Sequence, residues 1–224
     1  MSKTFFFSDT HFNHKNVIKY EPIRVKYVAE FMVKKGKFRT YDEAVEFINS
    51  AYDSEDKDNI KVVLYYHDEM IIHRWNQKVK GSDTVWFLGD WGLGSKTYLS
   101  SCIKRLNGDI RMIKGNHDNF PNQWYLDNGV KYCSKYPVVL KGRFIAGHYP
   151  PIEYVFDDDG NVIKVIDHRL EDNFHIYAFG HVHSNENFET VTKNSRCFCC
   201  ERQEMEPIEW DVYNKYNSIE NWNI

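Results

Sequence analysis

Five short apolar segments, each ending in a loop that carries Asp, Asn or His, are the feature that most constrains the fold of this 224-residue chain. The segments are residues 4–8, 85–88, 110–114, 144–146 and 176–179. Their length and their apolar character predict buried strands. Strands of one α/β sheet deliver their C-terminal loops to a common edge, where such proteins place their sites. We therefore expect the polar side chains after these strands to meet.

Helical patterns fill the gaps between the predicted strands. Thr40-Tyr41-Asp42-Glu43 is a capping-box signature, and apolar residues at helical spacing follow it. Further amphipathic helices are expected over about 62–75, 95–106 and 122–128. Strands that alternate with helices predict an α/β protein.

The length fits one domain, residues 1–224, with two insertions. A charged, mainly helical insertion is expected at about 20–58, and a hairpin insertion at about 156–174. The run Asp157-Asp158-Asp159-Gly160-Asn161 is a strong turn signal inside the second insertion. Its acidic tip could look like a calcium loop, but the spacing does not match an EF-hand, so a solvated turn is favoured.

Charge and composition narrow the partners and the compartment. A net charge of −3 argues against a surface that binds duplex nucleic acid. No apolar run approaches the ~20 residues of a membrane helix, and the start lacks a signal-peptide pattern. The five cysteines do not resemble a secreted disulfide framework, so we expect reduced thiols in the cytoplasm. The oligomeric state stays open.

Three of the cysteines, Cys197, Cys199 and Cys200, crowd together near the end of the chain. They lack the spaced pairs of a structural zinc site and have no second pair or His nearby. The period-two placement of Cys197 and Cys199 favours an edge strand with partly buried thiols over a zinc site.

The side chains that follow the predicted strands form a set of oxygen and nitrogen donors. The set consists of Asp9, His11, Asp90, Asn116, His148, His181 and His183. Donors of this kind favour Mn, Fe, Zn, Ni or Co over soft metals. The set exceeds what one metal with an open position requires, and it suits two cations that share a bridging carboxylate and bind a phosphate. Each short motif alone fits a surface turn, whereas their joint occurrence after apolar strands favours a site.

The motifs Asp9-x-His11, Gly89-Asp90, Gly115-Asn116-His117-Asp118, Gly147-His148 and Gly180-His181-x-His183 together resemble the calcineurin-like metallophosphoesterase superfamily. The resemblance runs from about residue 5 to 184 and is greatest to the small bacterial and phage phosphoesterases. It implies a four-layer α/β/β/α sandwich with two central mixed β-sheets.

The resemblance also implies a role for each matching residue. Asp9, His11, Asp90 and His183 would hold one metal. Asp90, Asn116, His148 and His181 would hold the second, with Asp90 bridging. His117 would protonate the leaving oxygen, and Asp118 would hold His117 in orientation.

The segment from Gly89 to Gly94 departs from the family pattern because it lacks the Arg that many members carry there. This departure favours a phosphodiester over a phosphomonoester. The DNA-repair nuclease branch adds a capping domain, for which this chain has too few spare residues.

The expected activity is hydrolysis of a phosphoester by in-line attack of a metal-bridging hydroxide, with two divalent cations, manganese first and Fe, Zn, Ni or Co as alternatives. The alternatives are a nucleotide phosphomonoesterase and a non-catalytic metal-binding scaffold of the same fold. Asn13 and His14 are candidate substrate contacts, with plain surface residues as the alternative interpretation.

Overall fold

Two mixed β-sheets form the centre of the molecule. The structure, a computed structural model, describes residues 2–140, 144–157, 162–168, 176–185 and 195–209. The first sheet has the strand order β11-β1-β2-β3-β4. Its strands are β11 (Ile208–Glu209), β1 (Thr4–Phe7), β2 (Thr84–Phe87), β3 (Asp109–Ile113) and β4 (Tyr132–Ser134). Strands β1 to β4 are parallel, and β11 is antiparallel to β1.

The second sheet has the order β10-β9-β6-β5. Its strands are β10 (Ser195–Cys197), β9 (Ile176–Phe179), β6 (Phe144–Ala146) and β5 (Val138–Leu140). The first three are parallel, and β5 is antiparallel to β6. The prediction of an α/β protein with two central mixed sheets is confirmed, whereas the four-layer order stays a prediction.

All five predicted strands are present, as β1, β2, β3, β6 and β9. The expected edge strand near the cysteines is β10, which lies at one edge of the second sheet. Strands β4, β5 and β11 were not predicted. Each is two or three residues long and carries exposed or half-buried side chains. The strands β4 and β11 include polar residues, and β5 is an apolar run that no loop with Asp, Asn or His follows.

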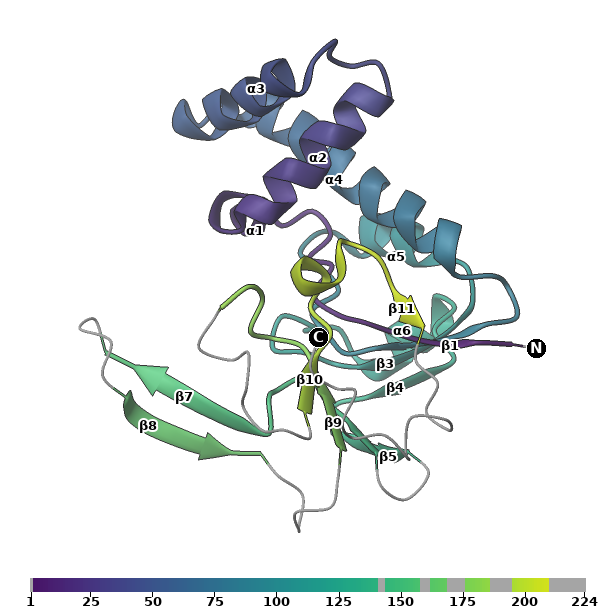
Figure 1. The fold of residues 1–224 in the computed structure, drawn as a ribbon. Coiled ribbons are helices and arrows are strands. Elements are labelled where there is room, and N and C mark those ends of the chain that lie inside the picture. The colour runs from purple at the N-terminus through teal and green to yellow at the C-terminus, as the bar shows by residue number, and fades with distance from the viewer. Residues whose placement is uncertain (1, 141–143, 158–161, 169–175, 186–194, 210–224) are drawn as a thin grey trace.

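The helices are α1 (Lys15–Tyr20), α2 (Pro22–Lys34), α3 (Tyr41–Asp53), α4 (Lys57–Lys78), α5 (Lys96–Lys104) and α6 (Asn122–Asp127), with a short 3-10 helix η2 (Cys200–Gln203). The predicted capping box starts α3, because the Glu43 amide donates to Thr40 Oγ1 at 3.2 Å and the Thr40 amide donates to Glu43 Oε2 at 3.3 Å. Figure 1 shows α1, α2 and α3 stacked beside α4 at one end of the molecule. Within the described residues, no helix combines the length and the apolar character needed to cross a membrane.

A separate two-stranded hairpin projects from the second sheet (Figure 1). It consists of β7 (Ile152–Phe156) and β8 (Val162–Asp167), which pair antiparallel. The hairpin begins at residue 152 rather than near 156, because the run before the acidic turn pairs with the run after it. The expected turn at 158–161 and the end of the insertion at 169–174 lie outside the described residues.

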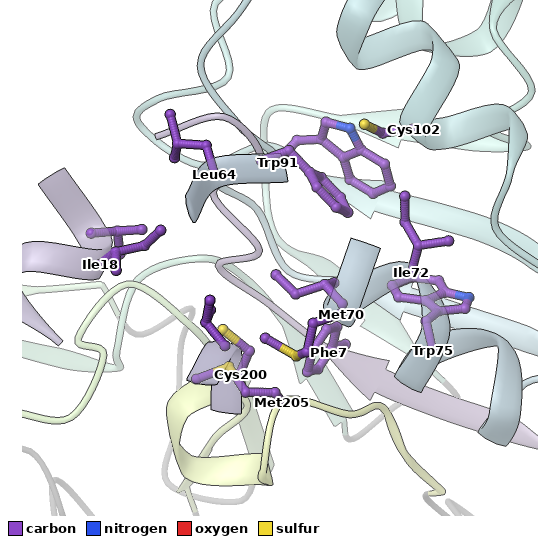
Figure 2. Packing of buried hydrophobic residues seen from close by; sticks show 14 of the residues in the cluster. Phe7, Ile18, Leu64, Met70, Ile72, Trp75, Trp91, Cys102, Cys200 and Met205 are labelled. Carbon is purple, nitrogen blue, oxygen red and sulfur yellow. The ribbon is translucent and has the colours of Figure 1, made fainter. Parts of the chain in front are cut away.

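The helices cover one face of the first sheet. Along β1, Phe5 and Phe7 point to one face of the sheet, and Phe6 between them points to the other face. Phe5 and Phe7 belong to the hydrophobic cluster that also contains apolar side chains of α2, α3, α4 and α5. Phe7 packs against Trp75 of α4, and their ring centroids are 5.8 Å apart. Both residues are labelled in Figure 2.

The other face of the first sheet packs on the second sheet. Phe6 lies between the two, with its ring centroid 5.2 Å from that of Phe144 and 5.1 Å from that of Phe198. Leu88, Ala146 and Ala178 belong to the same buried cluster. The two sheets therefore share a core, and this shared core sets the distance between the loops that follow their strands.

Candidate metal centre

The loops after the five predicted strands meet at one edge of the two sheets. Backbone hydrogen bonds join them: the Asp9 amide donates to the Gly89 carbonyl at 2.9 Å, and the Gly180 amide donates to the His148 carbonyl at 2.8 Å. The His11 amide donates to the Asp90 carbonyl at 3.1 Å. The expected convergence of these loops is therefore present, and it is held by the main chain rather than by side chains alone.

The backbone at this edge is strained. Five of the seven predicted metal ligands have positive φ angles: Asp9 (59°), His11 (48°), Asp90 (59°), His181 (72°) and His183 (50°). A non-glycine residue in this region costs about 1–3 kcal/mol. Such strain persists only where the surroundings hold it, and it clusters at functional sites. The left-handed turns bring consecutive donors back toward one point instead of letting them alternate along a strand.

Two glycines permit the close approach of neighbouring loops. A Cβ atom on Gly115 would overlap Asp90 Oδ1, and a Cβ atom on Gly180 would overlap Asp9 Oδ2. Any larger residue would push the carboxylate away from the cluster. In these two motifs the glycine before the donor is therefore required because a side chain there would overlap a neighbouring carboxylate.

The first group of candidate ligands contains Asp9, His11 and His183, which each offer a ligand atom within 4.8 Å of the others. Asp9 Oδ1 lies 3.9 Å from His11 Nε2 and 3.9 Å from His183 Nε2. These separations leave room for an ion between the three atoms.

The second group contains Asp90, His148 and His181. Asn116 Oδ1 completes it, at 2.9 Å from His148 Nε2 and 3.0 Å from His181 Nδ1. All seven predicted ligands are therefore brought together, in the two groups that the resemblance implied.

Asp90 lies between the two groups. Its Oδ2 is 3.6 Å from His11 Nε2 and 3.5 Å from His148 Nε2. Its Oδ1 accepts a hydrogen bond from the His117 amide at 2.9 Å. The carboxylate is thus anchored by one oxygen and faces both groups with the other.

Two of the candidate imidazole ligands are oriented by a hydrogen bond at Nδ1, the ring nitrogen that does not face the centre. His148 Nδ1 lies 2.8 Å from the Leu88 carbonyl, which can only accept, so Nδ1 carries the proton and Nε2 is left as a lone pair. His183 Nδ1 lies 2.9 Å from Glu201 Oε1. Donation from Nδ1 to a carbonyl or carboxylate is the usual support for a histidine that binds metal through Nε2.

Glu201 is paired with Arg24, and both side chains are fully buried. The Arg24 Nε donates to Glu201 Oε1 at 2.7 Å. Its Nη2 donates to the Asp9 carbonyl at 2.6 Å, and its Nη1 donates to the Thr10 carbonyl at 3.0 Å. One guanidinium therefore ties helix α2 to the first site loop and to η2.

The pair shifts the ionisation of the groups around it. Burial opposes the charge on Glu201, but the charge of Arg24 and the hydrogen bond from His183 outweigh it and hold the pKa of Glu201 well below its usual range. Burial also opposes protonation of His183, but the hydrogen bond and charge of Glu201 raise its pKa to about 9. A buried carboxylate thus stays ionised behind the candidate ligand.

The Arg24 network extends into helix α4. Arg24 Nη1 lies 2.8 Å from His67 Nε2, which must accept because a guanidinium has only donors. His67 Nδ1 then donates to Asp68 Oδ1 at 2.7 Å, and Asp68 Oδ2 accepts from the Asn13 amide at 2.9 Å. His67 is fully buried, and it links Arg24 to Asp68, which binds the first site loop at Asn13.

Sequence reasoning missed Arg24, Glu201 and Asp68. Arg24 lies on the same face of α2 as Val28 and Met32, at intervals of four residues. A single arginine in a row of apolar residues was therefore the sequence pattern that could have indicated a buried arginine. Glu201 follows the cysteine cluster and carries no local signal.

The cysteine cluster touches the centre through Asp9. The Cys199 thiol donates to Asp9 Oδ2 at 3.2 Å, and Cys200 Sγ lies 3.1 Å from the Asp9 carbonyl. Within the described residues, none of the groups that could hold a metal includes a cysteine. The thiols are buried rather than partly buried, because they pack behind the loop.

His117 lies beside the first group. Its ring centroid is 5.3 Å from that of His11 and 5.8 Å from that of His14, and its side chain is half-buried. The carboxylate of Asp118 binds backbone amides. The expectation that Asp118 orients His117 is corrected by the hydrogen bonds that its carboxylate accepts.

Asp118 Oδ2 accepts from the Asp90 amide at 2.7 Å and the Gly115 amide at 2.8 Å, and Oδ1 accepts from the Trp91 amide at 3.0 Å. Burial raises the pKa of Asp118, and these backbone bonds counteract the shift. Asp118 therefore joins the second and third site loops. Its carboxylate accepts three hydrogen bonds from backbone amides, whereas a single imidazole would supply one.

Asn13 and His14 have different surroundings. The Asn13 amide group donates to the Leu93 carbonyl at 2.8 Å, so it holds a neighbouring loop. His14 Nδ1 lies 3.1 Å from His11 Nδ1 at the half-buried rim of the centre. Burial, together with the charge of His117, lowers the pKa of His14 to about 4. Of these two side chains, that of His14 is the one that contacts a candidate ligand, His11.

The buried donors fit a cation. His11 Nε2 is buried without a hydrogen-bond partner, although it faces two carboxylates. Burial, with the charge of Arg24, lowers the pKa of His11 well below its usual value, so the ring presents a lone pair. Burial and the charge of Asp9 raise the pKa of Asp90 to about 7, against the effect of His148. A cation between these atoms would satisfy both the orphaned nitrogen and the desolvated carboxylate.

Comparisons with known proteins give the fold without an activity. No family model matches this chain. The uncharacterized protein MJ1445 from Methanocaldococcus jannaschii is 28% identical over 159 residues, which cover 66% of this chain and 70% of that protein. The crystal structure of the protein of unknown function AQ665 from Aquifex aeolicus is similar with a TM-score of 0.53 at 18% identity, covering 93% of this chain and 96% of that one. The second likeness supports the fold alone.

We predict that Arg24→Met destabilises the protein by about 3–5 kcal/mol, because it leaves the Glu201 carboxylate buried without its partner. The free energy of unfolding in urea measures the effect. Glu30→Ala, an exposed change on the same helix, is the matched control and should stay within about 0.5 kcal/mol of the unchanged protein. A loss below about 1 kcal/mol for Arg24→Met would contradict the role given to the pair.

Proposed function

We propose that this chain hydrolyses a phosphoester, with a phosphodiester preferred, using two divalent cations held at the candidate metal centre. The observation that carries the proposal is the position of Asp90 Oδ2, 3.6 Å from His11 Nε2 and 3.5 Å from His148 Nε2. A carboxylate shared by two ligand groups is what a two-metal site requires. When bound, the cations would supply positive charge for the phosphoryl oxygens and lower the pKa of the attacking water.

The protein's own residues would hold and aim the groups that react. Leu88 and Glu201 fix the tautomers of His148 and His183, so that each directs Nε2 at the centre. Manganese is the first candidate, with Fe, Zn, Ni and Co as alternatives, because the donors are oxygen and nitrogen. The five cysteines are free thiols, which fits a reducing compartment such as the cytoplasm.

His117 is the proposed proton donor. Its half-buried ring lies next to His11 at the rim of the centre, whereas its amide anchors Asp90. A protonated imidazole in that position would give its proton to the leaving oxygen, a step worth about 10²–10⁴-fold in rate.

The substrate preference is tested by comparing bis-p-nitrophenyl phosphate with p-nitrophenyl phosphate in the presence of Mn²⁺. We expect a higher kcat/KM for the diester, because the Gly89–Gly94 segment lacks the arginine associated with the phosphate contacts of related phosphatases. A higher value for the monoester would favour the nucleotide phosphomonoesterase instead. Absence of turnover on both esters with metal bound would favour the non-catalytic scaffold.

We predict that His117→Ala lowers kcat by about 10²–10⁴-fold while the bound metal persists, because the imidazole donates a proton without being a ligand. Steady-state kinetics and elemental analysis on the same sample measure both quantities. His73→Ala, on helix α4, is the matched control and should keep full activity. Full activity of His117→Ala would remove this residue from the mechanism.

We predict that Asp90→Asn loses bound metal, because an amide replaces the charge that both groups share. Asn tolerates the left-handed backbone of this position, so the loop can keep its conformation. Metal per chain is measured by elemental analysis after equilibration with Mn²⁺, with Asp109→Asn on β3 as the exposed control. An unchanged stoichiometry in Asp90→Asn would show that the bridging assignment is wrong.

A further inference from the structure

A pocket of about 300 Å³ adjoins the candidate metal centre. It is lined by Ile145 and Tyr177 of β6 and β9, and by Ile113 and Lys114 at the end of β3. Its walls also include Tyr136, Pro137, Tyr149 and His168. Its volume is at the lower end of the range of small-molecule sites, about 300–1,000 Å³.

We infer that this pocket receives a planar aromatic ring of the substrate, so that the phosphoester hydrolysed at the centre is a nucleotide with its base in the pocket. The inference rests on the proposed function and names its substrate class. The pocket and the centre share a wall, because His148 lines the pocket and also offers Nε2 to the second ligand group.

Tyr149 connects the two places directly. Its ring centroid lies 5.1 Å from that of His148 and 4.8 Å from that of His181. The ring of Tyr149 also stacks on His168, with centroids 4.9 Å apart and an angle of 11° between the rings. A substituent of a phosphate bound at the centre would therefore lie close to the ring of Tyr149, which follows the candidate ligand His148 in the chain.

The walls suit a flat ring attached to an anionic group. Tyr136 is 73% exposed, so its ring is available as a stacking surface. Its backbone is fixed, because Ser134 Oγ donates to the Tyr136 carbonyl at 2.8 Å and accepts from the Tyr136 amide at 3.0 Å. Two lysines and no carboxylate are among the described residues that line the pocket, which agrees with a phosphate ester. Stacking on fixed aromatic side chains is how proteins bind bases of any sequence.

The test compares two chromogenic diesters that differ only in the nucleoside. We expect the p-nitrophenyl ester of thymidine 5′-phosphate to have a kcat/KM at least about tenfold above that of methyl p-nitrophenyl phosphate, mainly through KM. Tyr136→Ala should reduce this ratio by about tenfold. Tyr20→Ala, which removes a tyrosine that is 68% exposed on α1, is the matched control and should keep the ratio.

A binding measurement separates this inference from the proposed function. Saturation-transfer NMR with thymidine, which has no phosphate, should detect binding that Tyr136→Ala and His168→Ala weaken. If such binding is found but no ester is hydrolysed, the pocket stands and the proposed function fails. If both esters are hydrolysed with equal KM and thymidine does not bind, the inference is overturned while the proposed function stands.

Discussion

The buried ion pair between Arg24 and Glu201 supports the rest of the candidate centre. A fully buried guanidinium is costly unless each side of its charge is paired and hydrogen-bonded. Arg24 meets this condition through Glu201 and the carbonyl groups of Asp9 and Thr10. Because Glu201 also accepts from His183, the same pair positions a backbone turn and a candidate ligand. Removing either Arg24 or Glu201 would therefore free both the Asp9 turn and the His183 side chain.

The left-handed residues explain why such support is needed. Asp9, Asp90 and His181 hold conformations that an isolated loop would leave, and each costs free energy. Asp118 binds three amides from two loops, and Gly115 and Gly180 leave space for the carboxylates. Packing between the two sheets then fixes the distance between the loops. The strain of the centre is thus held by the residues that surround it.

Helix α2 is more than an insertion between site loops. Its apolar face packs in the core with α4, and Arg24 on that face reaches the Asp9 turn. His67 and Asp68 of α4 hold the same turn from behind. The helical segment therefore belongs to the architecture of the centre, whereas β7 and β8 form a hairpin whose base borders the pocket at Pro151 and His168.

Much of the fold followed from local pattern. Apolar runs predicted β1, β2, β3, β6 and β9, and the capping box predicted the start of α3, because burial and capping act over a few neighbouring residues. The short strands β4 and β11 carry no such pattern, and β5 is an apolar run without a polar loop after it.

The candidate donors could also be predicted, because each one follows a predicted strand. The expected single sheet is two sheets: β1, β2 and β3 lie in the first and β6 and β9 in the second, and the core between the sheets brings both sets of strand ends together. By itself the sequence determined which residue types reach that edge. Only the tertiary structure decided that Glu201 stands behind His183, that Asp118 binds backbone amides instead of His117, and that Tyr149 forms a pocket wall. Arg24 and Glu201 are 177 residues apart, and no periodicity in a chain records a contact over that separation.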